Sequence, residues 1–274
     1  MALRSLLDWV APREGAWVLE VDLSKFFDTI PHDRLLEVIS ERIGDRKILH
    51  LIHAWLKAGY KEKDVVVSSE TGTPQGGVIS PLAANVYLDK VLDQWITREY
   101  LPTLRGEGFL VRYADDFVLA FTDEAECRQA DRDITARVEE FGLRVNRDKT
   151  RITDLRRPCA EPPDTREKAE IHFLGFSVYW KTCPNTGWQL AVRTSTKSIK
   201  RFKERLSSWL EMCGDLTPGD LMDRLEAKVR GHRGYFGVEG NEDMLDLVED
   251  MVRGALYRAS FPTSSGANTD SSLP

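Results

Sequence analysis

The sequence predicts an α+β domain, with an antiparallel sheet and helices on one face of it, followed by a small helical domain. Three observations support this fold class. Ala16–Leu23 is a run of bulky apolar and β-branched residues around a central Glu20, which is typical of a buried strand. Phe109–Phe121 has two apolar arms around a polar centre, which is the spacing of a tight hairpin. From Thr194 onward the composition changes to segments with helical periodicity.

Helices follow the first strand. Asp33 can cap one helix and Asp45 a second, which Gly59 ends. A Gly/Pro-rich loop then leads directly into a longer helix, so that the loop and the helix form one unit. The expected segments are, in order, a helix Asp33–Arg42, a helix Asp45–Ala58, a strand Val65–Ser69, the loop Thr71–Gly77 and a helix Ser80–Arg98.

The second half of the chain continues the same alternation. After the hairpin we expect a helix Asp123–Phe141, a strand pair or a strand and turn over Leu143–Asp154, a proline-containing loop Arg156–Lys168, and a hairpin of Ile171–Trp180 with Trp188–Arg193. Three helices are expected at Ser198–Cys213, Pro218–Tyr235 and Asn241–Tyr257, and a disordered polar tail at Thr263–Pro274. These segments divide the chain into a short N-terminal stub (1–14), a main domain (15–193), a helical domain (194–258) and a tail (259–274).

Composition limits the function classes. The chain has 274 residues, and no stretch approaches the roughly 20 consecutive apolar residues that a bilayer span needs, so we expect no membrane partner. Its four cysteines form no C-x-x-C pair, which favours reduced thiols in the cytoplasm. Since the net charge is -6, any binding of nucleic acid must depend on local basic patches. Thr194–Arg205, rich in Lys and Arg, is such a patch, although a basic helix is often only a solvated face.

Three aspartates are candidates for metal chemistry. Asp22 ends the first strand, and Asp115 and Asp116 lie at the tip of the predicted hairpin. Aspartates are also common in turns, so the pair alone carries little weight. If the strand and the hairpin are neighbours, three carboxylates share one sheet edge and require a cation among them. Hard oxygen ligands select magnesium, and a two-metal site can activate a 3′-hydroxyl while stabilising a pyrophosphate leaving group.

Five segments resemble, in order and approximate spacing, the catalytic motifs of reverse transcriptases, and among these the proteins encoded by bacterial group II introns. They are Val21–Asp28 (VDLSKFFD), Gly72–Leu88 (GTPQGGVISPLAANVYL), Arg112–Phe117 (RYADDF), Gly142–Thr150 (GLRVNRDKT) and Phe173–Phe176 (FLGF). The helical segment resembles the thumb or maturase domain of this family, with His232 in Arg230–Phe236 where the family usually has tryptophan. The resemblance implies a polymerase-type palm over 15–193 and a thumb/maturase domain over 194–258.

The resemblance also implies roles for single residues near the reaction. Asp22, Asp115 and Asp116 would be catalytic and would hold two Mg²⁺ ions, for which Mn²⁺ can substitute. Phe27 would lie beneath the sugar and clash with a 2′-hydroxyl, and its alternative role is that of a core residue. The remaining candidates for binding nucleotide or template are Gln75 and Gly76, beside the incoming nucleotide, and Lys149, which would reach the triphosphate or protonate the pyrophosphate unless it is a plain surface lysine.

A second group of residues is implied in binding primer and RNA. Phe173, Leu174 and Gly175 match a hairpin that supports the primer strand, where the aromatic residues also suit a core. Basic residues of the helical domain would line a phosphate backbone; they are Lys197, Lys200, Arg201 and Lys203.

The function implied is that of an RNA-directed DNA polymerase, a nucleotidyltransferase that adds dNTPs to a primer 3′-OH. Its partners would be an RNA template and a DNA or RNA primer, with intron RNA and a splicing (maturase) role as a further implication. Residues 1–14 cannot replace the fingers region that family members carry before the first motif, so we expect a fingers-bearing polypeptide as an additional partner. The alternative is a non-catalytic or fragmentary RNA-binding, maturase-like protein without polymerase activity of its own.

Overall fold

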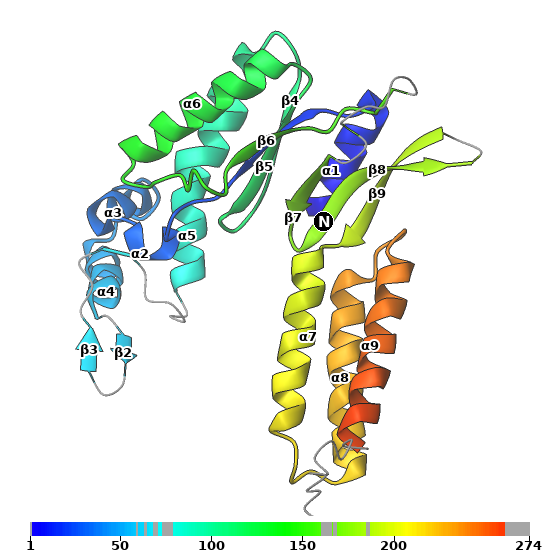
Figure 1. The fold of residues 1–274 in the computed structure, drawn as a ribbon. Coiled ribbons are helices and arrows are strands. Elements are labelled where there is room, and N and C mark those ends of the chain that lie inside the picture. Colours follow the sequence, from blue (N-terminus) through cyan, green and yellow to red (C-terminus); the bar gives the residue numbers. More distant parts are fainter. Residues whose placement is uncertain are drawn as a thin grey trace, which may run out of the picture. The chain divides into compact units, whose positions relative to one another are not determined.

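A computed structural model describes residues 2–58, 60–62, 65–67, 71–72, 79–159, 166, 169–184 and 187–260 (Figure 1). The chain divides into two compact units, and each is described by itself. The first comprises Met1–Leu174 and Val178–Leu190, and the second comprises Gly175–Ser177 and Ala191–Pro274. The fold is α+β, as the sequence predicts.

A four-stranded antiparallel sheet forms the centre of the first unit, with the strand order β4-β5-β1-β6. Its strands are β1 (Trp17–Val21), β4 (Gly108–Tyr113), β5 (Asp116–Phe121) and β6 (Arg151–Asp154). In β1, Leu19 and Val21 point to one face of the sheet and join the main core. Glu20 points to the opposite face. This alternation later decides on which side the aspartates lie.

Helices lie on the side of the sheet that carries Leu19 and Val21. They are α2 (Phe26–Thr29), α3 (His32–Ser40), α4 (Arg46–Lys57), α5 (Ser80–Leu88) and α6 (Glu124–Glu140). Buried side chains of α5 and α6, such as Tyr87 and Ile134, share one core with Phe117 and Leu119 of β5. The predicted helix Ser80–Arg98 is present, but after Leu88 it continues as two π-helical turns, Asp89–Asp93 and Ile96–Tyr100, and a 3-10 turn, Leu101–Thr103.

An N-terminal helix, to which the sequence analysis assigned no element, packs against β4. This helix is α1 (Ala2–Val10), followed by a 3-10 turn, Ala11–Arg13. Its residues Leu3, Leu6 and Val10 are buried, and the Trp9 ring stacks on Phe109 with centroids 5.7 Å apart. Leu3, Leu6 and Val10 have helical spacing, but the segment is too short for periodicity alone to distinguish a helix from a strand.

The remaining strands form a short hairpin and a second sheet. The hairpin is β2 (Tyr60–Glu62) with β3 (Val65–Val67), and β3 lies within the predicted strand Val65–Ser69. The second sheet has the order β7-β8-β9, with β7 (Glu170–Phe173), β8 (Phe176–Cys183) and β9 (Gly187–Thr194). The predicted single arm Ile171–Trp180 is therefore two strands with a turn between them. Most of the predicted loop Arg156–Lys168 and residues 261–274 of the predicted tail lie outside the described residues, whereas residues 259 and 260, also assigned to the tail, belong to the last helix.

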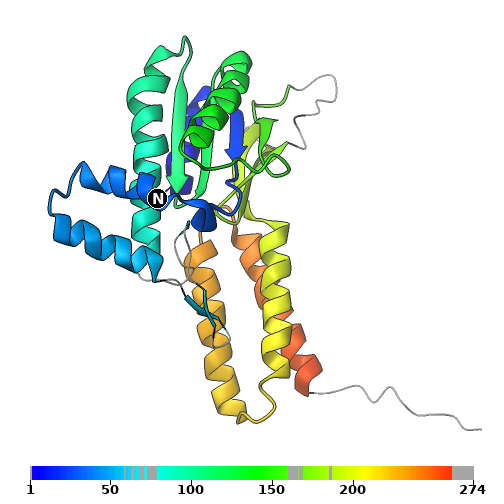
Figure 2. The ribbon, with the colours of Figure 1, turned by 90° about the vertical axis from the view of Figure 1, so that its left-hand side faces the viewer.

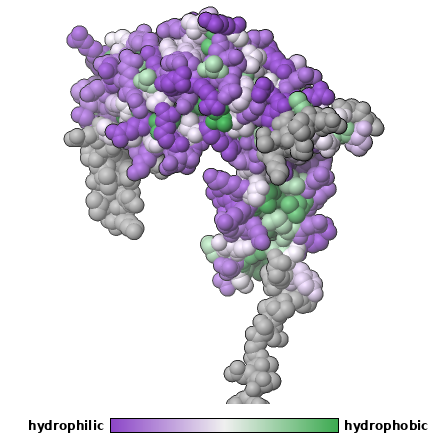
Figure 3. All heavy atoms as spheres, turned by 45° about the horizontal axis from the view of Figure 1, so that its top comes forward, coloured by the Kyte–Doolittle hydropathy of each residue, from purple (hydrophilic) through white to green (hydrophobic). Residues whose placement is uncertain are grey.

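The second unit contains the three predicted helices, α7 (Thr196–Glu211), α8 (Pro218–Phe236) and α9 (Glu242–Ser260). Leu206, Leu225, Val248 and Val252 form its own small core. Hydrophobic side chains also gather on the surface of this unit, whereas the visible face of the first unit is mainly hydrophilic (Figure 3). None of the described helices is long and apolar enough to cross a membrane.

Candidate active site

Strand pairing places Asp22 and Asp116 next to each other. β1 and β5 are antiparallel with Val21 opposite Phe117, and one further step in this register sets Asp22 opposite Asp116. Side chains alternate along a strand, so both aspartates lie on the face of Glu20, away from the helices that cover the other side. Two of the three carboxylates that were expected on one sheet edge are thus on the same side of adjacent chain segments.

The turn between β4 and β5 carries the third carboxylate. Tyr113 pairs with Asp116, so the turn consists of Ala114 and Asp115, and Asp116 is the first residue of β5 rather than part of the tip. Ala114 has φ 55°, a left-handed conformation that an L residue seldom adopts. Arg112 holds this conformation from the helix side, since its guanidinium donates to the Ala114 carbonyl at 2.8 Å and to Asp93 Oδ1 at 2.7 Å. The turn that presents Asp115 is therefore braced.

The carboxylates interact electrostatically. The pKa of Asp116 is raised from 3.8 to about 6, first because the surrounding protein partly desolvates the carboxylate, and then because the negative charges of Asp115, Glu20 and Asp22 lie near it. The Leu174 N–H donates to Asp116 Oδ2 at 3.3 Å and opposes this shift. Asp116 nevertheless keeps an exposed side chain. The site therefore combines several negative charges with access from solvent, which are the two conditions for binding a cation.

The fourth predicted motif wraps around Asp22. The Asp22 N–H donates to Thr150 Oγ1 at 3.2 Å, and the Asn146 N–H donates to the Asp22 carbonyl at 2.8 Å. Lys149 Nζ lies 3.4 Å from both carboxylate oxygens of Asp22. Lys149, expected at the triphosphate, is thus adjacent to a candidate metal ligand, and its ammonium partly neutralises that ligand.

Mg²⁺ requires several hard oxygen ligands around one point. Among the described residues, no three His, Cys, Asp or Glu side chains lie close enough together to hold a metal ion as they stand. The donors themselves are suitable, because Asp22 and Asp116 offer hard carboxylate oxygens on one face and their mutual repulsion is what a divalent cation relieves. The residues therefore fit Mg²⁺ in their donor atoms and in lying on the same face of the sheet. Side-chain rearrangement would be needed to bring three ligands together.

Glu20 is a residue that the sequence analysis noted only as a charge within an apolar run. It is buried and accepts two hydrogen bonds from the Arg151 guanidinium, at 2.6 and 3.0 Å. It also accepts one from the His172 N–H at 2.7 Å, which ties β7 to the sheet. A charged residue inside a buried strand requires such partners. This requirement is the feature of the sequence from which a structural role of Glu20 could have been predicted. Glu20 lies on the same face of the sheet as Asp116 and adds negative charge near that residue. Its bond to His172 also fixes the position of β7.

Phe27 and the glycine-rich loop follow the first motif. Phe26 is buried in the core, whereas Phe27 is half-buried against it, with ring centroids 5.2 Å apart. Gln75 and Gly76 lie outside the described residues. The start of their loop is held in place, because His32 Nε2 lies 2.5 Å from the Gly72 carbonyl oxygen and the Gly72 N–H donates to the Ile30 carbonyl at 2.8 Å.

The candidate primer hairpin is a tight turn between β7 and β8. Leu174 and Gly175 have φ of 51° and 80°. Both turn positions are thus left-handed, as in the type I′ turns that commonly connect two-residue hairpins. Phe173 is buried, which both of its predicted roles require. In the second unit, the Gly175 carbonyl accepts hydrogen bonds from the Ser195 N–H at 2.9 Å and from Ser198 Oγ at 3.0 Å.

The predicted basic residues of the helical domain lie on α7. All four are exposed: Lys197, Lys200, Arg201 and Lys203. At about 100° per residue, the first three cluster on the side of α7 opposite the buried Leu206. This face is therefore both positively charged and accessible.

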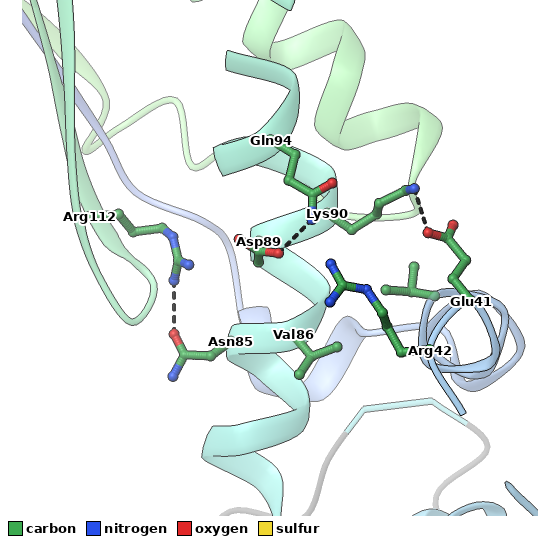
Figure 4. A pocket seen from close by; sticks show the side chains of 9 residues that line it. Glu41, Arg42, Asn85, Val86, Asp89, Lys90, Gln94 and Arg112 are labelled. Atoms are coloured by element: carbon green, nitrogen blue, oxygen red, sulfur yellow. Dashed lines mark hydrogen bonds and ion pairs between the residues drawn. The ribbon is translucent and has the colours of Figure 1, made fainter. Parts of the chain in front are cut away.

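A separate cavity of about 400 Å³ lies between α3, α5 and the π-helical turns that follow α5, and Arg112 is one of the residues that line it (Figure 4). Most polar side chains along it are paired with one another: Lys90 Nζ lies 2.7 Å from Glu41 Oε2, and Arg112 donates to Asn85 Oδ1 at 2.9 Å. Because these groups pair with each other, the side chains that line the cavity support the β4–β5 turn and leave few free groups for a ligand.

Comparison with known proteins identifies the family. The sequence model for "Reverse transcriptase (RNA-dependent DNA polymerase)" matches residues 2–178. The chain belongs to the reverse transcriptase family. The five motifs singled out from the sequence fall within this match, and the antiparallel sheet with helices on one face is its palm.

Relatives connect this reverse transcriptase to group II introns. Protein YkfC of Escherichia coli K12 is 34% identical, with 50% of this chain and 43% of that protein aligned. The group II intron-encoded protein LtrA of Lactococcus lactis subsp. cremoris is 44% identical over 29% of this chain and 13% of LtrA. This chain therefore spans less than half the length of these relatives. A solved structure of telomerase from Candida albicans in complex with a fragment of telomeric RNA has a TM-score of 0.49 and 14% identity, covering 94% of this chain and 49% of that one.

Proposed function

We propose that the chain is the catalytic part of an RNA-directed DNA polymerase of the group II intron type, which adds dNTPs to a primer 3′-OH on an RNA template. The observation that carries this proposal is the strand register that sets Asp22 opposite Asp116, with Asp115 in the adjoining braced turn. Membership of the reverse transcriptase family supports it independently.

The three aspartates would hold two Mg²⁺ ions, or Mn²⁺ in their place. Bound there, the ions would make the 3′-hydroxyl a better nucleophile and neutralise charge on the departing pyrophosphate. Asp116 has a pKa of about 6 and is therefore mainly ionised at neutral pH. Asp22 must exchange its ion pair with Lys149 for the metal. The released ammonium would then be free to attract the triphosphate or to protonate the pyrophosphate.

Other residues would bind the substrates. Phe27 would exclude a 2′-hydroxyl, since its ring is partly exposed and packs on the core, and Gln75 and Gly76 would contact the nucleotide and template. The turn Leu174–Gly175 would support the primer, because the Leu174 N–H already contacts Asp116. The basic face of α7 would contact the phosphate backbone of primer, template or intron RNA.

A second candidate function is RNA binding without DNA synthesis, as in a maturase that assists splicing. The exposed lysines and arginine of α7 favour it, because they need none of the carboxylates.

Primer extension on an RNA template with dNTPs and Mg²⁺ separates the two functions. We expect extension by the wild type and its loss, by a factor of about 10³ or more, in Asp115→Ala/Asp116→Ala. A matched control, Asp215→Ala/Asp223→Ala, removes two exposed aspartates of the second unit and should leave extension unchanged. No extension by the wild type, with RNA binding retained, would favour the maturase-like function.

Nucleotide selection tests Phe27. Phe27→Ala removes the ring that would meet a 2′-hydroxyl, so we expect the preference for dNTP over rNTP to fall by about tenfold or more, measured as the ratio of kcat/KM values. Phe27→Tyr keeps the ring and should keep the preference. An unchanged preference in the alanine variant would assign Phe27 to the core.

A further inference from the structure

We propose that the outer side of α4 is an RNA-binding surface separate from the active site. It is defined by Arg46, Lys47, His50, Leu51, Trp55 and Lys57, and is called the α4 surface below. The helix has 12 residues, among them three Lys or Arg, two His and no acidic residue. This composition is notable in a chain with a net charge of -6.

The α4 surface combines an apolar stripe with a basic one. Ile52 and Leu56 bury one side of the helix in the main core. On the outer side, Ile48, Leu51 and Trp55 are 45%, 48% and 48% exposed. Their spacing of three and four residues places them on a single stripe.

The basic stripe runs beside the apolar one. At about 100° per residue, Arg46, His50 and Lys57 fall within about 40° of one another, and Lys47 lies between them and the apolar stripe. Within the part of the chain that the structure describes, neither Arg46, Lys47 nor Lys57 has a carboxylate partner at ion-pair distance. These charges are thus free to bind an anion.

The position of α4 leaves this side accessible. α4 packs on α3, and α3 packs on α5, so α4 lies on the far side of α5 from the sheet (Figures 1 and 2). The surface therefore does not belong to the site formed by Asp22 and Asp116, which is on the opposite face of the sheet.

A polyanion with flat apolar faces is the occupant that fits both stripes. Lys and Arg contact phosphates, and an exposed indole stacks on an unpaired base, which is how proteins bind single-stranded nucleic acid without sequence preference. A purely apolar protein partner would leave the neighbouring cations without counter-charges. Single-stranded RNA, as in the unpaired regions of a structured RNA, is therefore the proposed partner.

Anisotropy of a short fluorescein-labelled oligouridine RNA, titrated with the full chain at several KCl concentrations, tests the proposal. The measurements use a Lys197→Gln/Lys200→Gln background to weaken binding by α7. Arg46→Gln/Lys47→Gln should weaken binding and reduce the slope of log K against log salt by about 1.4, since each lost phosphate contact removes about 0.7. Both positions are in the first turn of α4, where loss of positive charge favours the helix, so the helix should remain folded.

Trp55→Ala tests stacking, and we expect a loss of affinity between about fivefold and a hundredfold with an unchanged salt slope. The matched control Arg132→Gln/Lys181→Gln removes two exposed cations elsewhere in the first unit and should change neither quantity. Unchanged affinity and slope in both α4 variants would overturn the proposal. If Trp55→Ala also altered the sedimentation coefficient, the α4 surface would instead be a protein interface.

This inference does not depend on polymerase activity. Asp115→Ala/Asp116→Ala should bind the oligouridine RNA as the parent protein does, with the same sensitivity to Arg46→Gln/Lys47→Gln. Absence of DNA synthesis by the wild type, with that sensitivity intact, would therefore count against the proposed function alone. Loss of the sensitivity, with DNA synthesis by the wild type intact, would count against the α4 surface alone.

Discussion

Among single residues, Glu20 accepts hydrogen bonds from several partners. Its buried carboxylate accepts from Arg151 and from the backbone of β7. We expect Glu20→Ala to lower the free energy of unfolding by about 3 kcal/mol, because the variant leaves a charge and an N–H without their partner. Urea unfolding measures this. Glu139→Ala, at an exposed position of α6, should stay within about 0.5 kcal/mol, and an equally small effect at Glu20 would contradict the network.

The raised pKa of Asp116 predicts that the free energy of unfolding depends on pH. Its folded pKa, about 6, lies above the unfolded value of 3.8, so the folded state binds the proton more tightly. The contribution of Asp116 is therefore full below about pH 4 and is lost as the pH rises through 6. Asp116→Asn removes this loss. The stability of Asp116→Asn relative to the wild type should thus rise between pH 4 and pH 7, in urea unfolding without divalent cations.

Asp154 provides a control of opposite sign. Partial burial raises the pKa of Asp154, but hydrogen bonds from Arg156 outweigh this and lower it overall. Its contribution is present above the unfolded pKa and is lost as the pH falls. Asp154→Asn should therefore become less stable relative to the wild type as the pH rises. The same sign for both variants would show that the shifts of the two carboxyl groups have been assigned wrongly.

At the level of secondary-structure elements, the β4–β5 hairpin carries strain in Ala114. Glycine adopts φ near 55° without the contact that a Cβ makes, so Ala114→Gly should raise the free energy of unfolding by about 0.5 to 1 kcal/mol. Ala58→Gly is the matched control, since Ala58 has φ -60° and glycine there should destabilise by about 0.5 kcal/mol. Equal effects at the two positions would mean that the turn relaxes in solution.

For the whole chain, the described residues of the helical unit have a core distinct from the one that contains Leu119, and this predicts separate unfolding transitions. Leu206 is buried in the core of the helical unit, and Leu119 in that of the sheet. Leu206→Ala should destabilise the helical unit by about 2 to 5 kcal/mol and shift only one transition in calorimetry, while Leu119→Ala shifts the other. Met212→Ala, at an exposed position, should shift neither. A single transition moved by both variants would show that the units unfold together.

Local patterns of sequence were enough for most elements and for the candidate ligands. The apolar run with Glu20, the N-cap Asp45 and the Asp-containing hairpin each depend on residues close in the chain, and the structure confirms the elements that they predicted. The expected cap Asp33 was wrong, because α3 begins one residue earlier, at His32, with Pro31 as its N-cap. The π-helical turns after Leu88 and the strand break at Leu174 were not predictable in this way. Their backbone conformations are selected by packing on other elements, which periodicity does not record.

The three candidate aspartates and the basic stretch of α7 could therefore be singled out from residue types and spacing, because chemistry of this kind needs particular side chains at particular intervals. The motifs were identified by their resemblance to those of reverse transcriptases. The pairing of Asp22 with Asp116, the brace from Arg112 to the Ala114 carbonyl, the ion pair of Lys149 with Asp22 and the exposure of Trp55 were not predictable in either way. The two contacts of Asp22 join groups far apart in the chain, and Arg112 supports the turn because it also binds Asp93. The exposure of Trp55 depends on which side of α4 packs on its neighbours. These features are set when strands choose their partners and helices their packing faces, and only the folded chain makes that choice.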